Sequence, residues 1–188
     1  MNLVSRLTVL LVVCLAPFAA CANDAIWKLL QGGGQVVLVR HALTTPGVGD
    51  PEDMTLSDCA TQRNLSAQGR EDARKLGDEL RRRDVPIGAI LSSPWCRCIE
   101  TSRLLLGREP EIEPALGNVF GRPEQGKAQV ATLREIASRT PRSGNTLMLT
   151  HGSTILALTG ISPDTSEMVI ATPRGNGQLV VVGRLLVR

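Results

Sequence analysis

The stretch Gln35-Val36-Val37-Leu38-Val39-Arg40-His41 decides how this chain folds. A run of Val and Leu that follows a glycine triplet and leads into a polar loop is typical of a parallel strand buried on both faces. A second run, Asn145-Thr146-Leu147-Met148-Leu149-Thr150-His151-Gly152, has the same form and also reaches a histidine. The 188 residues hold only these two histidines. Because open α/β sheets bind ligands just beyond the carboxyl ends of their strands, we expect both imidazoles at one active site.

The rest of the chain alternates between helical and strand patterns, which favours an α/β fold with a mostly parallel sheet. Helices are expected at residues 24–31, 66–83, 94–106, 125–139 and 153–159, and further strands at 87–91, 111–113, 167–171 and 178–187. Asn176-Gly177, between the last two strands, is a strong signal for a tight hairpin, so the edge of the sheet should be antiparallel. The connection at 42–64 is long, and loops of that length are often functional.

Composition sets limits on partners and location. A formal net charge of +3, 2% aromatic residues and no Tyr argue against a base-stacking nucleic-acid platform. Residues 1–22 have the pattern of a secretory signal peptide, with Arg6 as its positive region and an apolar stretch too short for a confident membrane span. Cleavage after Ala22 would leave a domain of residues 23–188 in the periplasm or outside the cell. The alternatives are lipidation of Cys21 and an uncleaved anchor.

Three cysteines follow the predicted signal peptide, and an oxidising compartment permits them to form a disulfide. Cys96 and Cys98 flank one residue, too close to be a favourable pair, so Cys59 could bond with either of them. The alternative is three small buried thiols. No further set of Cys and His has the spacing of a zinc site, and the sequence predicts neither a metal nor another cofactor.

Arg40, His41, Arg97 and His151 together would make a compact cationic pocket rich in hydrogen-bond donors. The planar guanidinium of arginine matches two phosphoryl oxygens at once. An imidazole nitrogen can act as a nucleophile when a hydrogen bond holds its other nitrogen. Each residue alone is weak support, because a histidine at a strand end is more often structural. The set predicts an anion site for a phosphoryl group, with a histidine available for attack and side-chain charge in place of a metal.

Four motifs resemble signatures of the histidine phosphatase superfamily, the phosphoglycerate mutase-like group, branch 1. In chain order they are Val37-Leu38-Val39-Arg40-His41-Ala42-Leu43-Thr44, Asn64-Leu65-Ser66-Ala67-Gln68-Gly69, the stretch from Ser92 to Thr101 around Arg97, and Thr150-His151-Gly152. Ala42 replaces the glycine of the Arg-His-Gly signature, a change we expect to be tolerated. Thr44 matches a threonine common after that signature and is a candidate substrate contact. The resemblance covers residues 36–182 and implies a three-layer α/β sandwich whose mostly parallel sheet has an antiparallel edge strand.

The resemblance also implies a role for each matching residue. His41 would be the nucleophile and form a phosphohistidine, which water would then hydrolyse. Arg40, Arg97 and His151 would bind the phosphoryl oxygens and stabilise the group in transfer. Arg122 is a further candidate substrate contact, for a second anionic group.

The general acid is where the sequence departs from the family. Members usually place a carboxylate after the third strand, and the matching residue here is Asn118, which cannot act as an acid. Glu124 is the nearest carboxylate downstream, although a solvent-facing charge near a helix start is favourable in itself. Asp50, Glu52 and Asp53 in the long loop are alternatives. An enzyme without a good acid would prefer leaving groups of low pKa, such as those of phosphoramidates, acyl phosphates or aryl phosphates.

The sequence therefore predicts a secreted or periplasmic, metal-independent phosphatase that acts on phosphomonoesters or similar small phosphorylated substrates through a phosphohistidine. Two other functions stay open. One is a phosphoglycerate mutase-like phosphotransferase, against which the signal peptide counts, and the other is a non-catalytic phosphate-binding module that has lost the acid. No nucleic acid and no stable membrane span are expected, and a lipid anchor at Cys21 would change the location and not the chemistry.

Overall fold

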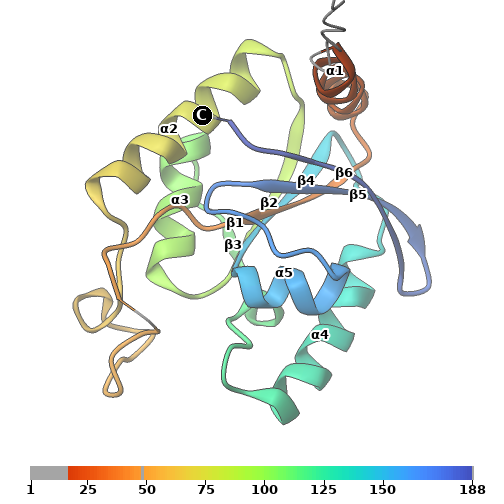
Figure 1. Ribbon diagram of the computed structural model, residues 1–188. Coiled ribbons are helices and arrows are strands. Elements are labelled where there is room, and N and C mark those ends of the chain that lie inside the picture. Colours follow the sequence, from red (N-terminus) through yellow and green to blue (C-terminus); the bar gives the residue numbers. More distant parts are fainter. Residues whose placement is uncertain (1–16, 48, 188) are drawn as a thin grey trace, which may run out of the picture.

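A six-stranded mixed sheet forms the middle layer of the protein (Figure 1). The computed structural model describes residues 17–47 and 49–187, except for the side chains of residues 17–22 and 123. The strands are β1 (Val36–Arg40), β2 (Ile87–Ser92), β3 (Glu111–Ile112), β4 (Asn145–Thr150), β5 (Met168–Gly175) and β6 (Gln178–Leu185). Their order is β3-β2-β4-β1-β5-β6. The first four strands are parallel to one another, β5 is antiparallel to β1, and β6 is antiparallel to β5.

Helices cover both faces of the sheet, which confirms the predicted three-layer α/β sandwich (Figure 1). The helices are α1 (Pro17–Gln31), α2 (Ala67–Arg82), α3 (Cys96–Leu106), α4 (Pro123–Ala137) and α5 (Gly152–Thr159). Val37 and Val39 of β1 pack in a core with α1, α2 and α3, whereas Val36 and Leu38 pack in a second core with α4 and α5. Side chains alternate across a strand, so a run that is apolar at every position is buried on both faces.

The sheet register places the two histidines side by side. Arg40, the last residue of β1, pairs with Thr150, the last residue of β4, in the parallel ladder. His41 and His151 therefore leave the sheet together at the carboxyl ends of two neighbouring strands, where a ligand site was predicted.

The structure differs from the expected elements mainly at their ends. The helix predicted at 24–31 begins earlier, at Pro17, so the predicted cleavage point after Ala22 falls within α1. The helix predicted to start at residue 94 begins at Cys96. Asn176 and Gly177 both have positive φ, 50° and 71°, as the predicted tight hairpin requires. Most of the predicted signal peptide, including Arg6, lies outside the described residues. Among the helices that the structure describes, none is long and apolar enough to cross a membrane.

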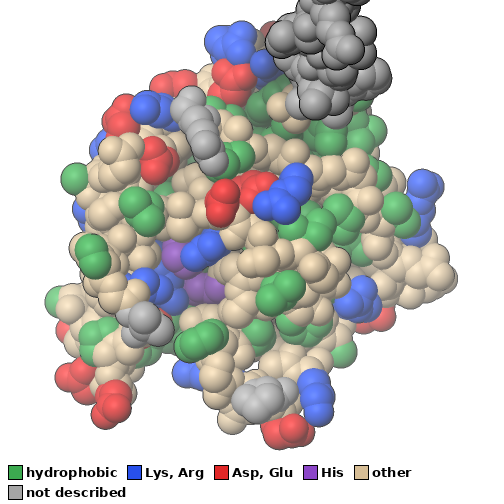
Figure 2. Space-filling model, viewed as in Figure 1, with side chains coloured by type: hydrophobic (Ala, Val, Ile, Leu, Met, Phe, Trp, Pro, Cys, Tyr) green, Lys and Arg blue, Asp and Glu red, His purple; other side chains and the backbone are tan. Residues whose placement is uncertain are grey.

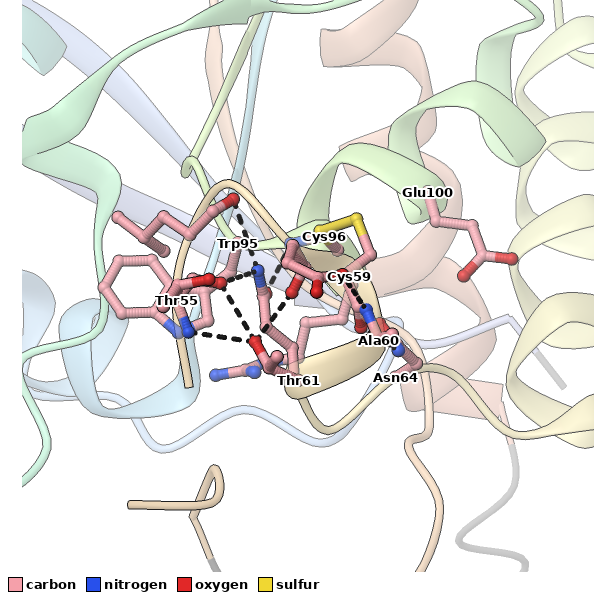
Figure 3. Close-up of a disulfide and its surroundings, with 12 residues drawn as sticks. Thr55, Cys59, Ala60, Thr61, Asn64, Trp95, Cys96 and Glu100 are labelled. Atoms are coloured by element: carbon pink, nitrogen blue, oxygen red, sulfur yellow. Dashed lines mark hydrogen bonds between the residues drawn. A yellow bond between two sulfur atoms is a disulfide. The ribbon is translucent and has the colours of Figure 1, made fainter. Parts of the chain in front are cut away.

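A disulfide between Cys59 and Cys96 fastens the long loop to the start of α3 (Figure 3). Of the two partners open to Cys59, the structure selects Cys96, and Cys98 is a buried free thiol. Burial raises the pKa of Cys98 to about 12, which keeps it protonated. The loop is also fixed beside the disulfide, because the Cys96 backbone N–H donates to Gln62 Oε1 at 2.9 Å. The loop therefore holds its residues in fixed positions over the carboxyl end of the sheet.

Candidate active site

A cavity of about 400 Å³ opens at the carboxyl ends of β1 and β4. Figure 2 shows the two imidazoles in this hollow, with cationic side chains beside them. Thirteen residues line it: Arg40, His41, Gly47, Gly49, Arg63, Arg97, Asn118, Phe120, His151, Gly152, Ser153, Leu156 and Ser162. The structure thus brings together four of the residues that the sequence predicts for catalysis, Arg40, His41, Arg97 and His151, from the end of β1, α3 and the end of β4.

His41 is prepared for nucleophilic attack by its backbone contacts. Its Nδ1 lies 2.9 Å from the carbonyl oxygen of Ala42, and because a carbonyl only accepts, Nδ1 must carry the proton. The other nitrogen, Nε2, then keeps its lone pair. Burial lowers the pKa of His41 to about 3, and the charges of Arg97 and Arg40 act in the same direction. The imidazole is therefore neutral at physiological pH, as a nucleophile must be.

The Ala42 substitution in the first signature is accommodated. Ala42 is fully buried and packs with Leu65 and Ala73 in a small cluster. Its backbone N–H donates to the hydroxyl of Thr101 at 3.1 Å, which ties the loop after His41 to α3. The extra methyl group therefore fills space between the loop and α2.

His151 is held from two sides. Its Nε2 lies 2.8 Å from the hydroxyl of Ser93, and its Nδ1 lies 3.3 Å from Nη2 of Arg97. Its ring stands edge-on to Trp95, with centroids 5.1 Å apart. Burial, followed by the neighbouring His41 and Arg97, holds the pKa of His151 well below its usual value. Because a guanidinium only donates, Nδ1 accepts from Arg97 here, and the neutral ring carries its proton on Nε2 and donates it to the Ser93 hydroxyl. Binding an oxyanion through Nδ1 requires the other tautomer, in which Ser93 donates to Nε2.

Arg97 is paired with a carboxylate of the long loop. Asp50 Oδ1 accepts from Arg97 Nη1 at 2.6 Å and Oδ2 from Nη2 at 3.1 Å. Asp50 also accepts from the Trp95 indole N–H and from the Arg63 backbone N–H, both at 3.1 Å. Burial alone would raise the pKa of Asp50, but the hydrogen bonds and charge of Arg97 outweigh it and hold the pKa below its usual value. Asp50 is therefore ionised and holds Arg97 in position. It is one of the loop carboxylates that the sequence offers as alternatives for the general acid.

Three guanidiniums line the cavity, and each has an N–H group that makes no hydrogen bond to the described residues. The Nε atoms of Arg40, Arg63 and Arg97 are buried and have no hydrogen-bond partner among the residues that the structure describes. Arg40 is anchored through Nη1, which donates to the Pro163 carbonyl at 2.8 Å. A Cβ atom at Gly152 would lie 3.2 Å from Arg40 Nε, so this glycine leaves room for the guanidinium. Buried N–H groups without partners at a concave cationic site are suited to binding an oxyanion.

Three predicted site residues lie outside the cavity. Glu124 is 86% exposed and pairs with Lys127 at 3.4 Å, so its position does not support the role of general acid. It sits in the first turn of α4, where a carboxylate favourably faces the helix dipole. Arg122 lies over the ring of Trp95 at 5.9 Å and does not line the cavity. Thr44 is buried in a bridge to Leu65 and contributes to the fold of the loop.

Asn118, which the resemblance aligns with the family's acid, has its amide oriented by two contacts. Its Oδ1 accepts from the Ser153 hydroxyl at 2.7 Å and from the Phe120 backbone N–H at 3.1 Å. Because the oxygen is used in these bonds, the NH₂ end is the part left to donate toward the cavity. The site therefore offers a hydrogen-bond donor where the family has a proton donor.

The motif around Ser66 has a structural role. Ser66 caps α2 by accepting from the Gly69 N–H at 3.0 Å, and its own backbone N–H donates to the Leu43 carbonyl at 3.0 Å. A Cβ atom at Gly69 would lie 1.9 Å from the Leu43 carbonyl oxygen. The motif pins the start of α2 against the segment that follows His41.

Arg63 and Ser93 are the site residues that sequence reasoning missed. Ser93 lies within the second arginine motif, but the sequence assigns it no role at the site. Arg63 belongs to none of the quoted motifs, and its one signal is its place directly before the Asn64-to-Gly69 motif, in a loop expected to be functional. Among the described residues, no three His, Cys, Asp or Glu side chains gather closely enough to hold a metal ion.

The comparisons with known proteins agree with this geometry. The protein-family model of the histidine phosphatase superfamily (branch 1) matches residues 36–132. The structure of the protein histidine phosphatase SixA complexed with tungstate is 21% identical, with a TM-score of 0.55 over 81% of this chain and 96% of that chain. The open reading frame Rv3214 from Mycobacterium tuberculosis is 16% identical, with a TM-score of 0.58 over 79% and 95%.

A third solved structure is phosphoserine phosphatase from Entamoeba histolytica in complex with 3-phosphoglyceric acid. It is 15% identical, with a TM-score of 0.57 over 82% of this chain and 98% of that chain. No curated protein sequence matches the chain. At these identities the solved structures establish the shared fold.

Proposed function

The chain belongs to the histidine phosphatase superfamily (branch 1) and is a histidine-type phosphatase, and we propose that it hydrolyses phosphomonoesters or similar small substrates through a phosphohistidine at His41. The observation that carries the proposal is the state of His41. Its Nδ1 is fixed by the Ala42 carbonyl, which leaves the lone pair of Nε2 free on a ring that lines the cavity together with Arg40 and Arg97.

The proposed reaction has two steps. Nε2 of His41 attacks phosphorus, the N–P bond forms, and the bond to the leaving group breaks with its electron pair on the leaving atom. Arg40, Arg97 and His151 hold the other three phosphoryl oxygens and stabilise their charge. Water then attacks the phosphohistidine, which releases phosphate and restores the imidazole. No step requires a metal ion.

The charge of the site suits one phosphoryl group. Arg40, Arg63 and Arg97 face the cavity and Asp50 offsets one of them, which leaves a net charge of about two. A phosphomonoester carries about −1.5 to −2 near neutral pH. This match of charges supports a substrate with one phosphoryl group and no second strongly anionic group. The same match counts against a phosphoglycerate mutase-like function.

The missing acid narrows the substrate class. With Asn118 in the acid's position and Glu124 exposed in solvent, the leaving group must depart with little help from a proton donor. Phosphoramidates, acyl phosphates and aryl phosphates meet that condition. One solved structure of the same fold is named a protein histidine phosphatase, and phosphohistidine is a phosphoramidate. This supports phosphoramidates as the first class to test.

We place the enzyme in the periplasm or outside the cell. The support is the signal-peptide pattern of residues 1–22 and the Cys59–Cys96 disulfide, which an oxidising compartment maintains. The functional domain would then be residues 23–188, free after cleavage or anchored by a lipid at Cys21. Mass spectrometry of the mature protein from its envelope fraction would distinguish the two termini.

A second candidate function is a phosphate-binding module without turnover, and the specific observation for it is Asn118 in place of the acid. Hydrolysis of para-nitrophenyl phosphate by residues 23–188, from acid to neutral pH with chelator present, decides between the two. We expect turnover that survives chelation and is lost in His41→Ala. Phosphate binding without turnover of either aryl phosphate or phosphoramidate would favour the binding module, whereas phosphate transfer to an added hydroxyl would favour the mutase.

A further inference from the structure

Arg63 lies in the active-site cavity but outside the four motifs that carry the resemblance to the family. It stands near the end of the long loop, two residues before the Leu65-Ser66 helix entrance, and it lines the cavity together with Gly47 and Gly49 of the same loop. The signatures around His41, Arg97 and His151 do not assign it a role.

The side chain of Arg63 is built into this position. Its Nη1 donates to the Gly47 carbonyl at 2.8 Å, and its backbone N–H donates to Asp50 at 3.1 Å. The neighbouring Gln62 side chain binds the backbone of Cys96, next to the disulfide, so the loop cannot withdraw easily. Its Nε is buried and has no partner among the described residues, so the guanidinium keeps donor capacity that the protein does not use.

Arg63 comes from the long loop, whereas Arg40, His41 and His151 lie at the ends of β1 and β4. Its charge lowers the pKa values of His41 and His151, but less than the charges of Arg97 and Arg40 do. We therefore expect Arg40, Arg97 and His151 to hold the phosphoryl group next to His41, with Arg63 on the loop side of the same cavity. In an in-line reaction the leaving group departs on the side away from His41.

We propose that Arg63 is a catalytic residue whose guanidinium donates hydrogen bonds to the leaving-group atom, in place of the acid that Asn118 has replaced. The proposal rests on the phosphatase function given above. As the N–P bond to His41 forms and the bond to a leaving oxygen breaks, that oxygen takes the electron pair, and the charge that builds on it is stabilised by Arg63. The oxygen then takes its proton from water, because a guanidinium stays protonated and serves only as an electrostatic partner.

A series of aryl phosphates with leaving groups of rising pKa tests this role. In Arg63→Gln we expect kcat/KM to fall about 100-fold for phenyl phosphate but only a few-fold for para-nitrophenyl phosphate, because the nitro group already stabilises the leaving oxygen. Arg63→Lys should recover part of the loss. Arg74→Gln, an exposed arginine of α2 outside the cavity, is the matched control and should follow the wild type.

The outcomes separate this inference from the proposed function. No turnover by the wild type would contradict the function, whereas turnover with an equal loss for every leaving group in Arg63→Gln would overturn only the role of Arg63. Vanadate binding, measured by calorimetry, gives a readout that does not depend on turnover, because bound vanadate places an oxygen at the leaving-group position. We expect Arg63→Gln to weaken vanadate binding about tenfold or more. Unchanged binding would also overturn the assignment.

Discussion

Asp50 binds Arg97 with both carboxylate oxygens, at 2.6 and 3.1 Å, although the two residues lie 47 positions apart in the chain. The side chains are 10% and 1% exposed, so the pair is screened from water. The contact joins the long loop to the helix that carries the second arginine motif. Asp50 is therefore a positioning residue, which fixes the guanidinium that binds the phosphoryl group.

Asp50→Asn should separate binding from turnover. The site gains one net positive charge, so inorganic phosphate should inhibit at least as strongly as in the wild type. Arg97 loses its ionic partner, so kcat should fall by about tenfold or more. Steady-state kinetics with phosphate inhibition measure both effects, and Asp53→Asn in an exposed part of the same loop is the control. Equal losses in phosphate affinity and in kcat would contradict a positioning role.

The buried His41 makes stability depend on pH in a definite direction. An unfolded histidine binds its proton near pH 6.5, whereas the folded one binds it only near pH 3. The unfolded state therefore takes up more protons in this window, and stability falls as the pH is lowered from about 6.5 toward 3. At pH 5 the loss attributable to His41 is about 2 kcal/mol.

Urea unfolding of the wild type and His41→Asn between pH 7 and pH 4 measures this loss. The variant should lose less stability on acidification, by about the same 2 kcal/mol at pH 5. Parallel curves for the two proteins would show that His41 is not held neutral by the fold.

Much of the fold could be predicted because it depends on local patterns. The run at 36–39 is apolar at every position, and the β1–β4 register places His41 beside His151. The hairpin at Asn176-Gly177 depends on the conformational preferences of two adjacent residues. The strand and the hairpin need no knowledge of contacts made across the chain, and the proximity of the two histidines follows from the general rule that ligand sites lie at the carboxyl ends of neighbouring parallel strands.

The parts that could not be predicted depend on long-range contacts. Nothing near Asp50 in the sequence indicates which arginine it meets, and the choice of Cys96 over Cys98 depends on how α3 faces the loop. Glu124 was a reasonable acid candidate by its proximity along the chain, but the start of α4 turns it to solvent. Arg63 carried no local pattern and became visible only through the cavity it lines.

Removal of the disulfide should loosen the loop that carries Asp50 and Arg63. The bond closes a segment of 37 residues, so the chain-entropy estimate gives a stabilisation of about 4 kcal/mol. We expect Cys59→Ala/Cys96→Ala to melt at a lower temperature and to lose activity toward aryl phosphates. Reductant should reproduce both effects in the wild type, and it should leave the double variant unchanged. A wild type insensitive to reductant in melting temperature and rate would contradict this account.

Gly69 is required for close contact between α2 and the segment after His41. Because a Cβ atom would lie 1.9 Å from the Leu43 carbonyl oxygen, Gly69→Ala must displace backbone, and we expect a loss of about 3 kcal/mol. Ser66→Ala, which removes only the helix cap at the same place, should cost about 1 kcal/mol. Thermal or urea unfolding measures both values. If Gly69→Ala were as stable as the wild type, α2 would not pack against the Leu43 backbone as described.

Identification of the phosphorylated residue during turnover tests the central claim most directly. The enzyme would be mixed with a radiolabelled aryl phosphate or phosphoramidate, quenched within a few turnovers, and mapped by mass spectrometry under conditions that preserve phosphohistidine. We predict the label on His41 in the wild type and no label in His41→Asn. Label on another residue, or steady turnover that His41→Asn retains, would contradict the phosphohistidine mechanism.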